Sequence, residues 1–279
     1  MKISVIIPTY NEENVILDCL KSLDKQTHKD FEVIVVDDGS NDKTLFNIKD
    51  IKFKNFRIII LNQDHQGPGI ARNFGAKKAK GDILVFVDAD MTFNKDFLKN
   101  LVKPIENETA KGTFSKEEYV SNWENPWARC WNINEGWVEK RRHPENYPDT
   151  QKVFRAILKS EFEKVGGFDR GGYTDDWTLS QKLGYDAIAA PNAKFYHKNP
   201  DNLHEIYSHA KWVAKREYKF GFFGYLVAFI RYSLPVSKLI GIYKAIKFKN
   251  ARFFVFKIIY NFGCFVGLFE YVLSGKSSK

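Results

Sequence analysis

Residues 83–93 read ILVFVDADMTF: five apolar residues are followed by Asp88 and Asp90, which are one residue apart. An unbroken apolar run of this length is typical of a strand that is buried on both faces of a parallel sheet. The two aspartates then lie at the carboxyl end of that strand, where open α/β sheets bind their ligands. Close carboxylates repel each other unless a cation lies between them, and a divalent ion that also binds phosphate meets this need. The alternative is that the aspartates only end the strand and cap a turn.

Short apolar runs and segments of helical pattern alternate on the amino-terminal side of this strand. Strands are predicted over residues 3–7, 32–36 and 58–61, and helices over 15–23 and 69–79. This alternation predicts an α/β fold with a mainly parallel, doubly wound sheet. Residues 105–150 show no clean period, so loops and short elements are expected there. The pattern resumes at Phe154, with a helix predicted over 176–183 and a strand over 184–190.

The chain has 279 residues, which is enough for one large α/β domain with or without an appended region. Its three cysteines, Cys19, Cys130 and Cys264, form no C-x-x-C pair, so we expect buried apolar residues rather than a zinc site or disulfides. The first apolar run is too short for a signal peptide. We therefore expect a cytoplasmic protein whose mature chain starts at Met1.

Basic residues are concentrated near the carboxyl end. The net charge of the chain is +9, but residues 206–279 hold 13 Lys and Arg against 2 acidic residues, whereas residues 1–205 carry a net charge of −2. The same region contains two apolar, aromatic runs, at 220–236 and 253–273. We therefore predict a catalytic domain over residues 1–205 and a basic, apolar helical region over 206–279.

The second apolar run is long enough to span a membrane, but Lys257, Asn261 and Glu270 interrupt it on different faces of a helix. Such helices either bury themselves against the domain or lie in a membrane interface. The positive charge favours the interface of an anionic membrane, so peripheral attachment to its cytoplasmic face is expected. Nucleic acid is disfavoured as a partner, because long apolar blocks separate the basic residues.

Two further motifs place polar side chains near strand ends. In VVDDGSNDKT, residues 35–44, Asp38 follows the second strand and is available to accept hydrogen bonds from a base or ribose, while Gly39 permits a sharp turn. A helix cap is an equally good interpretation of this motif alone. Arg72, in GPGIARNFGAKKAKGD at residues 67–82, lies on a helix from which it reaches towards a diphosphate.

Five motifs occur in a fixed order: SVIIPTYNEE, EVIVVDDGSNDKT, ARNFGAKKAKGDILVFVDAD, FEKVGGFDR and TDDWTLSQKLGYD. Together they resemble the inverting glycosyltransferases of family 2, nucleotide-sugar transferases with the GT-A fold, over roughly residues 3–200. The resemblance implies that a nucleoside pocket is lined by Pro8, Tyr10, Glu12 and Asp38. It also implies that Arg72 approaches the diphosphate of the donor.

The resemblance implies a metal and a base as well. Asp88 and Asp90 match the D-x-D that holds Mg²⁺ or Mn²⁺ on the diphosphate, and Asp88 thereby also contacts the donor. His197 resembles the position from which many relatives supply a third metal ligand, although a packed turn residue is an equal alternative. Asp176 matches the catalytic base, and Asp175 stands where a supporting Glu is usual.

Gly167 and Trp177 resemble the wall of the site that receives the donor and acceptor sugars, although Trp177 also fits a core position. The expected reaction moves one sugar from a nucleotide-diphospho-sugar, with uridine as the first choice of base, to a hydroxyl or phosphate. A lipid-linked acceptor is favoured over other saccharides because of the basic, apolar tail. Residues 208–212 match the Q-x-x-R-W of processive relatives only in part, which favours transfer of a single sugar.

Two other classes of protein share some of these sequence features. A dinucleotide-dependent oxidoreductase is disfavoured, because no G-x-G-x-x-G follows the first predicted strand. A non-catalytic sugar-nucleotide-binding or membrane-associated scaffold remains the alternative, and hydrolysis of nucleotide sugars separates it from an enzyme.

Overall fold

A computed structural model describes residues 1–169 and 175–275, except for the side chains of Asp175 and Asp176. The chain divides into two compact units. Among the described residues, the first unit comprises those within 1–119 and 146–197, and the second comprises 120–145 and 198–275. The predicted division into a catalytic domain over residues 1–205 and a helical region over 206–279 stays a prediction.

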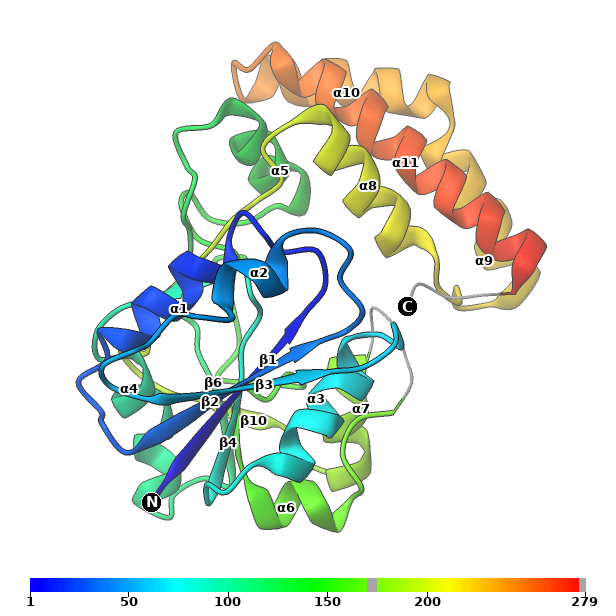
Figure 1. Cartoon of the computed structure of the whole chain (residues 1–279). Coiled ribbons are helices and arrows are strands. Elements are labelled where there is room, and N and C mark those ends of the chain that lie inside the picture. Colours follow the sequence, from blue (N-terminus) through cyan, green and yellow to red (C-terminus); the bar gives the residue numbers. More distant parts are fainter. Residues whose placement is uncertain (170–174, 276–279) are drawn as a thin grey trace. The chain divides into compact units, whose positions relative to one another are not determined.

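The first unit is built around a mainly parallel sheet, as the sequence predicts (Figure 1). Within the described residues this sheet has eight strands in the order β3-β2-β1-β4-β9-β6-β10-β8. The first four are parallel neighbours, whereas β9 pairs antiparallel with both β4 and β6. The strands are β1 (Ile3–Thr9), β2 (Phe31–Asp37), β3 (Arg57–Asn62), β4 (Ile83–Phe86), β6 (Gly112–Phe114), β8 (Thr150–Gln151), β9 (Ala156–Leu158) and β10 (Ala187–Ala189).

Helices cover both faces of this sheet, so its central strands are buried throughout. Because successive side chains of a strand point to opposite faces, Val33 and Val35 join one core cluster while Ile34 and Val36 join the other. The first cluster packs against α1 (Ile16–Asp24), α2 (Thr44–Ile48) and α4 (Phe97–Glu106). The second packs against α3 (Pro68–Lys78), α6 (Lys159–Lys164) and α7 (Asp175–Leu183).

A small second sheet continues from the end of β4. Its strand order is β5-β11-β7, with β5 (Met91–Phe93), β7 (Glu118–Val120) and β11 (Phe195–His197). In the antiparallel pairing of β11 with β5, His197 lies opposite Met91. This register brings the end of β11 next to Asp90, although the two lie 107 residues apart in the chain.

The described part of the second unit is helical. It contains α5 (Pro126–Glu135), α8 (Leu203–Ala214), α9 (Gly221–Tyr232), α10 (Leu234–Lys247) and α11 (Arg252–Ser274). Phe253 and Phe256 of α11 pack with Trp131 of α5, so residues predicted as loops and short elements supply a helix to this core. A Cβ atom at Gly267 would lie 2.1 Å from the backbone oxygen of Lys211, which shows how closely α11 approaches α8.

The polar residues that interrupt α11 have partners within the second unit. The buried Lys257 donates from Nζ to Oδ1 of Asn134 at 2.8 Å, and the buried Asn261 donates to Oγ of Ser237 at 2.9 Å. Glu270 forms an ion pair with Lys211 at 2.6 Å. By length and composition, α11 alone, or α11 together with the bent pair α9 and α10, meets the criteria for a membrane span. Its buried polar contacts identify α11 as a core helix of this unit.

Candidate active site

Two arginines hold the first aspartate of the D-x-D. Asp88, which follows β4, accepts a hydrogen bond from Nη2 of Arg72 at 2.8 Å and one from Nη1 of Arg155 at 3.2 Å. Burial opposes ionisation of this carboxyl group, but the charges of Arg155 and Arg72 outweigh it and hold the pKa of Asp88 well below its usual range. The two guanidinium groups therefore favour the ionised form of Asp88 at the carboxyl end of the sheet.

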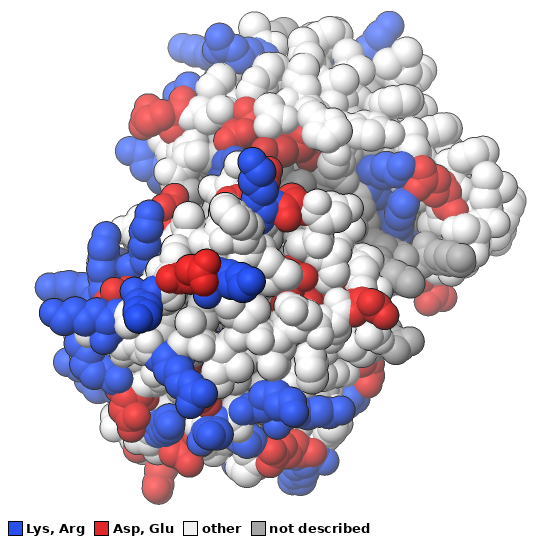
Figure 2. Space-filling model, in the orientation of Figure 1, with Lys and Arg blue, Asp and Glu red and all other residues white. Residues whose placement is uncertain are grey.

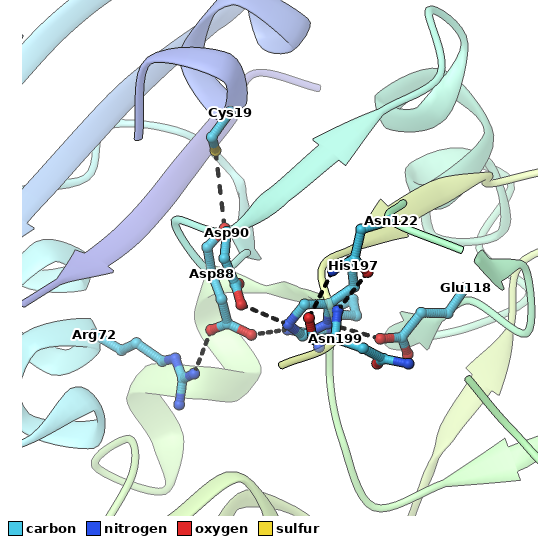
Figure 3. Close-up of polar contacts among 9 residues, drawn as sticks. Cys19, Arg72, Asp88, Asp90, Glu118, Asn122, His197 and Asn199 are labelled. Carbon is cyan, nitrogen blue, oxygen red and sulfur yellow. Dashed lines mark hydrogen bonds and ion pairs between the residues drawn. The ribbon is translucent and has the colours of Figure 1, made fainter. Parts of the chain in front are cut away.

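The second aspartate belongs to a chain of three side chains, shown in Figure 3. Oδ2 of Asp90 lies 2.9 Å from Nε2 of His197, and Nδ1 of the same imidazole lies 2.8 Å from Oε1 of Glu118. The three residues come from the start of β5, from β11 and from β7, so the small sheet assembles this group. The structure thus brings His197 to the D-x-D, as the resemblance implies.

The negative charge of this region acts on Glu12. Burial first, and then the charges of Asp90 and Asp88, raise the pKa of Glu12 from 4.5 to about 8. A bound cation would offset this excess of negative charge. Carboxylate oxygens and an imidazole nitrogen are also ligands that Mn²⁺ accepts, so the residues present fit a divalent cation.

The described residues contain no group of three or more His, Cys, Asp and Glu side chains arranged to hold a metal. Mg²⁺ and related ions at nucleotide sites usually take one or two protein ligands, with phosphate oxygens filling other positions. Asp90 and His197 supply such a pair. A cation held by Asp90 and His197 would need the phosphate oxygens of a ligand to fill other positions.

The predicted nucleoside pocket lies beside the amino-terminal strand tip. Pro8 is buried in β1, and the ring of Tyr10 stacks on the imidazole of His65 with the centroids 4.1 Å apart. The backbone nitrogen of Glu12 donates to Oγ1 of Thr44 at 2.8 Å, which ties the two strand tips together. A half-exposed aromatic ring in this place offers a flat surface to a base.

Asp38 is buried and both of its carboxylate oxygens already have partners. Oδ1 accepts from the side chain of Gln63 at 2.6 Å and from the backbone of Gln66 at 2.9 Å. Oδ2 accepts from the backbone of Gly67 at 2.8 Å and lies 2.9 Å from Nδ1 of His65. Asp38 thus organises residues 63–67 before any nucleoside binds, and its contact with a base stays a prediction.

The other predicted donor contacts have clear structural roles as well. Gly167 adopts a φ of +76°, and a Cβ there would lie 2.3 Å from Oδ1 of Asn73, so only glycine fits. Trp177 is 42% exposed and carries Nζ of Lys152 over its ring at 5.7 Å. It is therefore not a core residue.

The predicted catalytic pair lies outside the described side chains. Helix α7 begins at Asp175, one residue before the predicted start at residue 176, so Asp175 and Asp176 both lie in its first turn. The structure describes no side-chain atoms for either residue. Their assignment as supporting carboxylate and base stays a prediction.

Sequence reasoning missed Arg155, Glu118 and His65. Arg155 reaches Asp88 because β9 runs antiparallel beside β4, a pairing that the predicted parallel alternation does not contain. Glu118 lies in a short strand within the region without a clean period. His65 follows β3 in a polar stretch that resembles an ordinary turn. No local signal marked these three residues.

The model of glycosyl transferase family 2 matches residues 4–166. A poly(ribitol-phosphate) beta-N-acetylglucosaminyltransferase, TarS of Staphylococcus aureus strain Mu50, is 45% identical over 103 residues, which are 36% of this chain and 18% of the relative. The chain thus spans less than a fifth of the length of that relative.

Two solved structures share the fold. TarS of S. aureus, residues 1–349 in complex with UDP-GlcNAc, superposes with a TM-score of 0.58 at 19% identity, covering 100% of this chain and 93% of that one. The mannosyltransferase PcManGT of Pyrobaculum calidifontis, in complex with GDP-Man and Mn²⁺, gives a TM-score of 0.60 at 20% identity, covering 94% and 86%. At these identities the likeness concerns the fold, which is therefore of the GT-A type.

Proposed function

Because the chain belongs to glycosyl transferase family 2, we propose that it is an inverting glycosyltransferase that moves one sugar from a nucleotide-diphospho-sugar to an acceptor. The observation that carries the proposal is the arrangement at the end of β4. There Asp88 is held between Arg72 and Arg155, and Asp90 meets His197. A charged, partly open group at the carboxyl edge of a parallel sheet suits a phosphorylated ligand.

A uridine diphosphate sugar is the proposed donor. One structure of this fold was solved with UDP-GlcNAc and another with GDP-Man, so guanosine is the alternative base. Tyr10 supplies a stacking surface for the base. Arg72 is already committed to Asp88 in this structure, so we propose that it acts on the diphosphate partly by keeping that aspartate ionised and oriented.

Asp90 and His197 are the proposed protein ligands of a Mg²⁺ or Mn²⁺ ion. When bound, the ion would neutralise the charge that develops on the departing nucleoside diphosphate. Asp88 was also predicted as a metal ligand, but its carboxylate already accepts from Arg72 and Arg155, so we propose that its role is electrostatic and towards the donor. Asp176 is the proposed base that takes the proton from the acceptor hydroxyl, with Asp175 as its neighbour.

We further propose that the second unit attaches the protein to an anionic membrane, on the cytoplasmic face, through helices α9 and α10. Exposed apolar side chains recur at helical spacing in each helix: Phe223, Leu226, Val227 and Ile230 in α9, and Leu239, Ile242, Tyr243 and Ile246 in α10. Each set follows the i, i+3, i+4, i+7 pattern of one helix face, and its side chains are turned to solvent.

The charges around these faces favour an anionic surface. No Asp or Glu occurs between Glu217 and Glu270, while Arg231, Lys238 and Lys247 are exposed along the same helices. In Figure 2 the surface over α10 and α11 is largely uncharged, with basic side chains at its edge. Apolar area with a basic rim is typical of helices that lie in a membrane interface. This attachment favours an acceptor that is itself held at the membrane, such as a lipid-linked saccharide.

Calorimetry with full-length protein tests the reaction. UDP and GDP are titrated with Mn²⁺ or with EDTA, and hydrolysis of the corresponding sugar nucleotides is measured in parallel. We expect one nucleotide to bind tightly only with the metal, and its sugar derivative to be hydrolysed slowly. Metal-dependent binding without any hydrolysis or transfer supports the scaffold instead, and undiminished binding in EDTA contradicts the metal assignment.

Flotation with liposomes tests the attachment. The full chain is mixed with vesicles of phosphatidylcholine alone or with about one third phosphatidylglycerol, and we expect recovery with the anionic vesicles only, because each basic residue near such a surface contributes about 1 kcal/mol. Equal recovery with both kinds of vesicle, or none with either, contradicts the proposal.

A further inference from the structure

We propose that Glu118 is a positioning residue for the metal site: it fixes the tautomer and orientation of His197, so that Nε2 is presented to the cation held by Asp90. The inference deepens the proposed function and rests on it for the identity of the metal. Nothing in the sequence motifs or in the comparisons assigns a role to Glu118.

The geometry of the imidazole carries the first step. Nδ1 of His197 lies 2.8 Å from Oε1 of Glu118, and Nε2 lies 2.9 Å from Oδ2 of Asp90. An ionised carboxylate only accepts hydrogen bonds, so the ring nitrogen that faces Glu118 must carry a proton. By the same rule Nε2 carries a proton where it faces Asp90 in this structure. A cation between Asp90 and the ring would take the place of that proton, while Glu118 keeps the proton on Nδ1.

The fold holds this arrangement in place. Glu118 and His197 lie on neighbouring strands, β7 and β11, and the backbone nitrogen of Phe195 donates to the carbonyl oxygen of Glu117 at 3.1 Å. Tyr119 follows Glu118 and Tyr196 precedes His197, and the centroids of the two tyrosine rings lie 5.9 Å apart. The side chains of Glu118 and His197 are 22% and 15% exposed, so both are largely shielded from water.

A carboxylate behind a histidine ligand has a known physical effect. It fixes the ring, raises the basicity of the ligating nitrogen and typically contributes about 10- to 100-fold to metal affinity. The other interpretation is that His197 merely bridges Asp90 and Glu118 to hold β5, β11 and β7 together. That role would change stability but would not show itself in metal affinity.

The test uses full-length protein and Mn²⁺ titrated by calorimetry, with UDP and without it, for the variants Glu118→Ala, Glu118→Gln and His197→Ala. The amide oxygen of Gln still accepts from Nδ1, so we expect Glu118→Gln to stay within a few-fold of wild type, whereas Glu118→Ala loses about 10- to 100-fold. Glu117→Ala is the matched control, because its side chain accepts from the backbone of Asn192 rather than from His197. Its Mn²⁺ affinity should be unchanged.

Two further measurements separate positioning from structure. Pulsed electron paramagnetic resonance of bound Mn²⁺ should show coupling to an imidazole nitrogen in the wild type and in Glu118→Gln, and weakened or absent coupling in Glu118→Ala. The double variant Glu118→Ala/His197→Ala should lose no more Mn²⁺ affinity than His197→Ala alone, because Glu118 acts on the cation only through His197.

The inference is overturned if Glu118→Ala binds Mn²⁺ as the wild type does while His197→Ala binds it weakly. It is also overturned if neither variant changes Mn²⁺ affinity or the nitrogen coupling, since His197 is then no ligand. In both cases the wild type can still bind a nucleotide and transfer sugar. Failure of wild-type nucleotide binding and transfer would instead overturn the proposed function.

Discussion

The end of β4 and the exposed faces of α9 and α10 differ in how far their side chains are satisfied by their surroundings. Around β4, charged groups that are partly withdrawn from water each have a partner: Asp88 has two arginines, and Asp90 has His197. On α9 and α10, apolar side chains such as Phe222 and Ile246 are 76% and 74% exposed to solvent. The first region is thus organised to receive ions, whereas the second presents apolar area that water solvates poorly. The difference teaches that the two units are suited to ligands of different chemistry.

The largest expected effect concerns Asp176, the proposed base in the first turn of α7. Asp176→Asn should leave α7 folded, because it removes only a charge that is favourable near a helix N-terminus, but Asn cannot accept a proton. We expect normal binding of UDP and Mn²⁺ and a loss of about 10² to 10⁴ in turnover, measured by release of UDP from the sugar nucleotide. Near-normal turnover would leave Asp176 with a structural role only and make Asp175 the next base to test.

The apolar region is probed by removing its exposed aromatic side chains. Phe222→Ser/Phe223→Ser should weaken binding to anionic vesicles by about 10- to 100-fold, since an inserted aromatic side chain contributes about 1–2 kcal/mol. Phe46→Ser is the matched control, because Phe46 is 81% exposed but lies in the first unit. Unchanged flotation of the double variant, or an equal loss with Phe46→Ser, would contradict a specific role of α9 in membrane binding.

The pairing of charges near β4 is sharpened by Arg155→Met, which keeps most of the side-chain volume. Asp88 would retain only Arg72, and we expect the free energy of unfolding to fall by about 1–2 kcal/mol, because a hydrogen bond to a charged group is lost. Thermal unfolding measures this loss, and Arg57→Met, at an exposed position of β3, serves as the control. Equal melting temperatures of wild type and Arg155→Met would mean that Arg72 alone satisfies Asp88.

A pH-dependent effect on stability concerns Glu12. Its folded-state pKa of about 8 lies above the ordinary value of 4.5, so the folded protein binds more protons than the unfolded chain between these values. Stability from this group therefore falls as the pH rises from about 4.5 to 8. In EDTA, Glu12→Gln should be more stable than wild type at pH 8, by up to about 4 kcal/mol, and equal to it at pH 4.

Thermal unfolding at both pH values checks this expectation, with Glu13→Gln as the neighbouring control. Adding Mn²⁺ and UDP should narrow the gap between wild type and Glu12→Gln, because a cation offsets the charges of Asp88 and Asp90 that disfavour ionised Glu12. A gap of the same size at pH 4 and pH 8 would contradict the raised pKa.

The sequence by itself determined the α/β fold and indicated one edge of the sheet as the place of the site. Buried strands are recognisable as short apolar runs, and in a parallel sheet their carboxyl ends meet at one edge. Asp38 follows the second predicted strand and Asp88 the fourth, so both were expected at that edge. Lys257 and Asn261 interrupt the last apolar run, and in the structure both side chains have partners within the second unit.

Only the tertiary structure decided which side chains complete the site. Glu118 lies 79 residues from His197 in the chain, and Arg155 lies 67 residues from Asp88. Both contacts depend on the register of short strands, which local propensity specifies weakly, because strand pairing is set by packing against distant residues. The same holds for residues 120–145, which join the helical unit through the packing of Trp131 with α11. The apolar side chains of residues 120–145 follow no helical or strand period, so only their packing against α11 determines which unit they join.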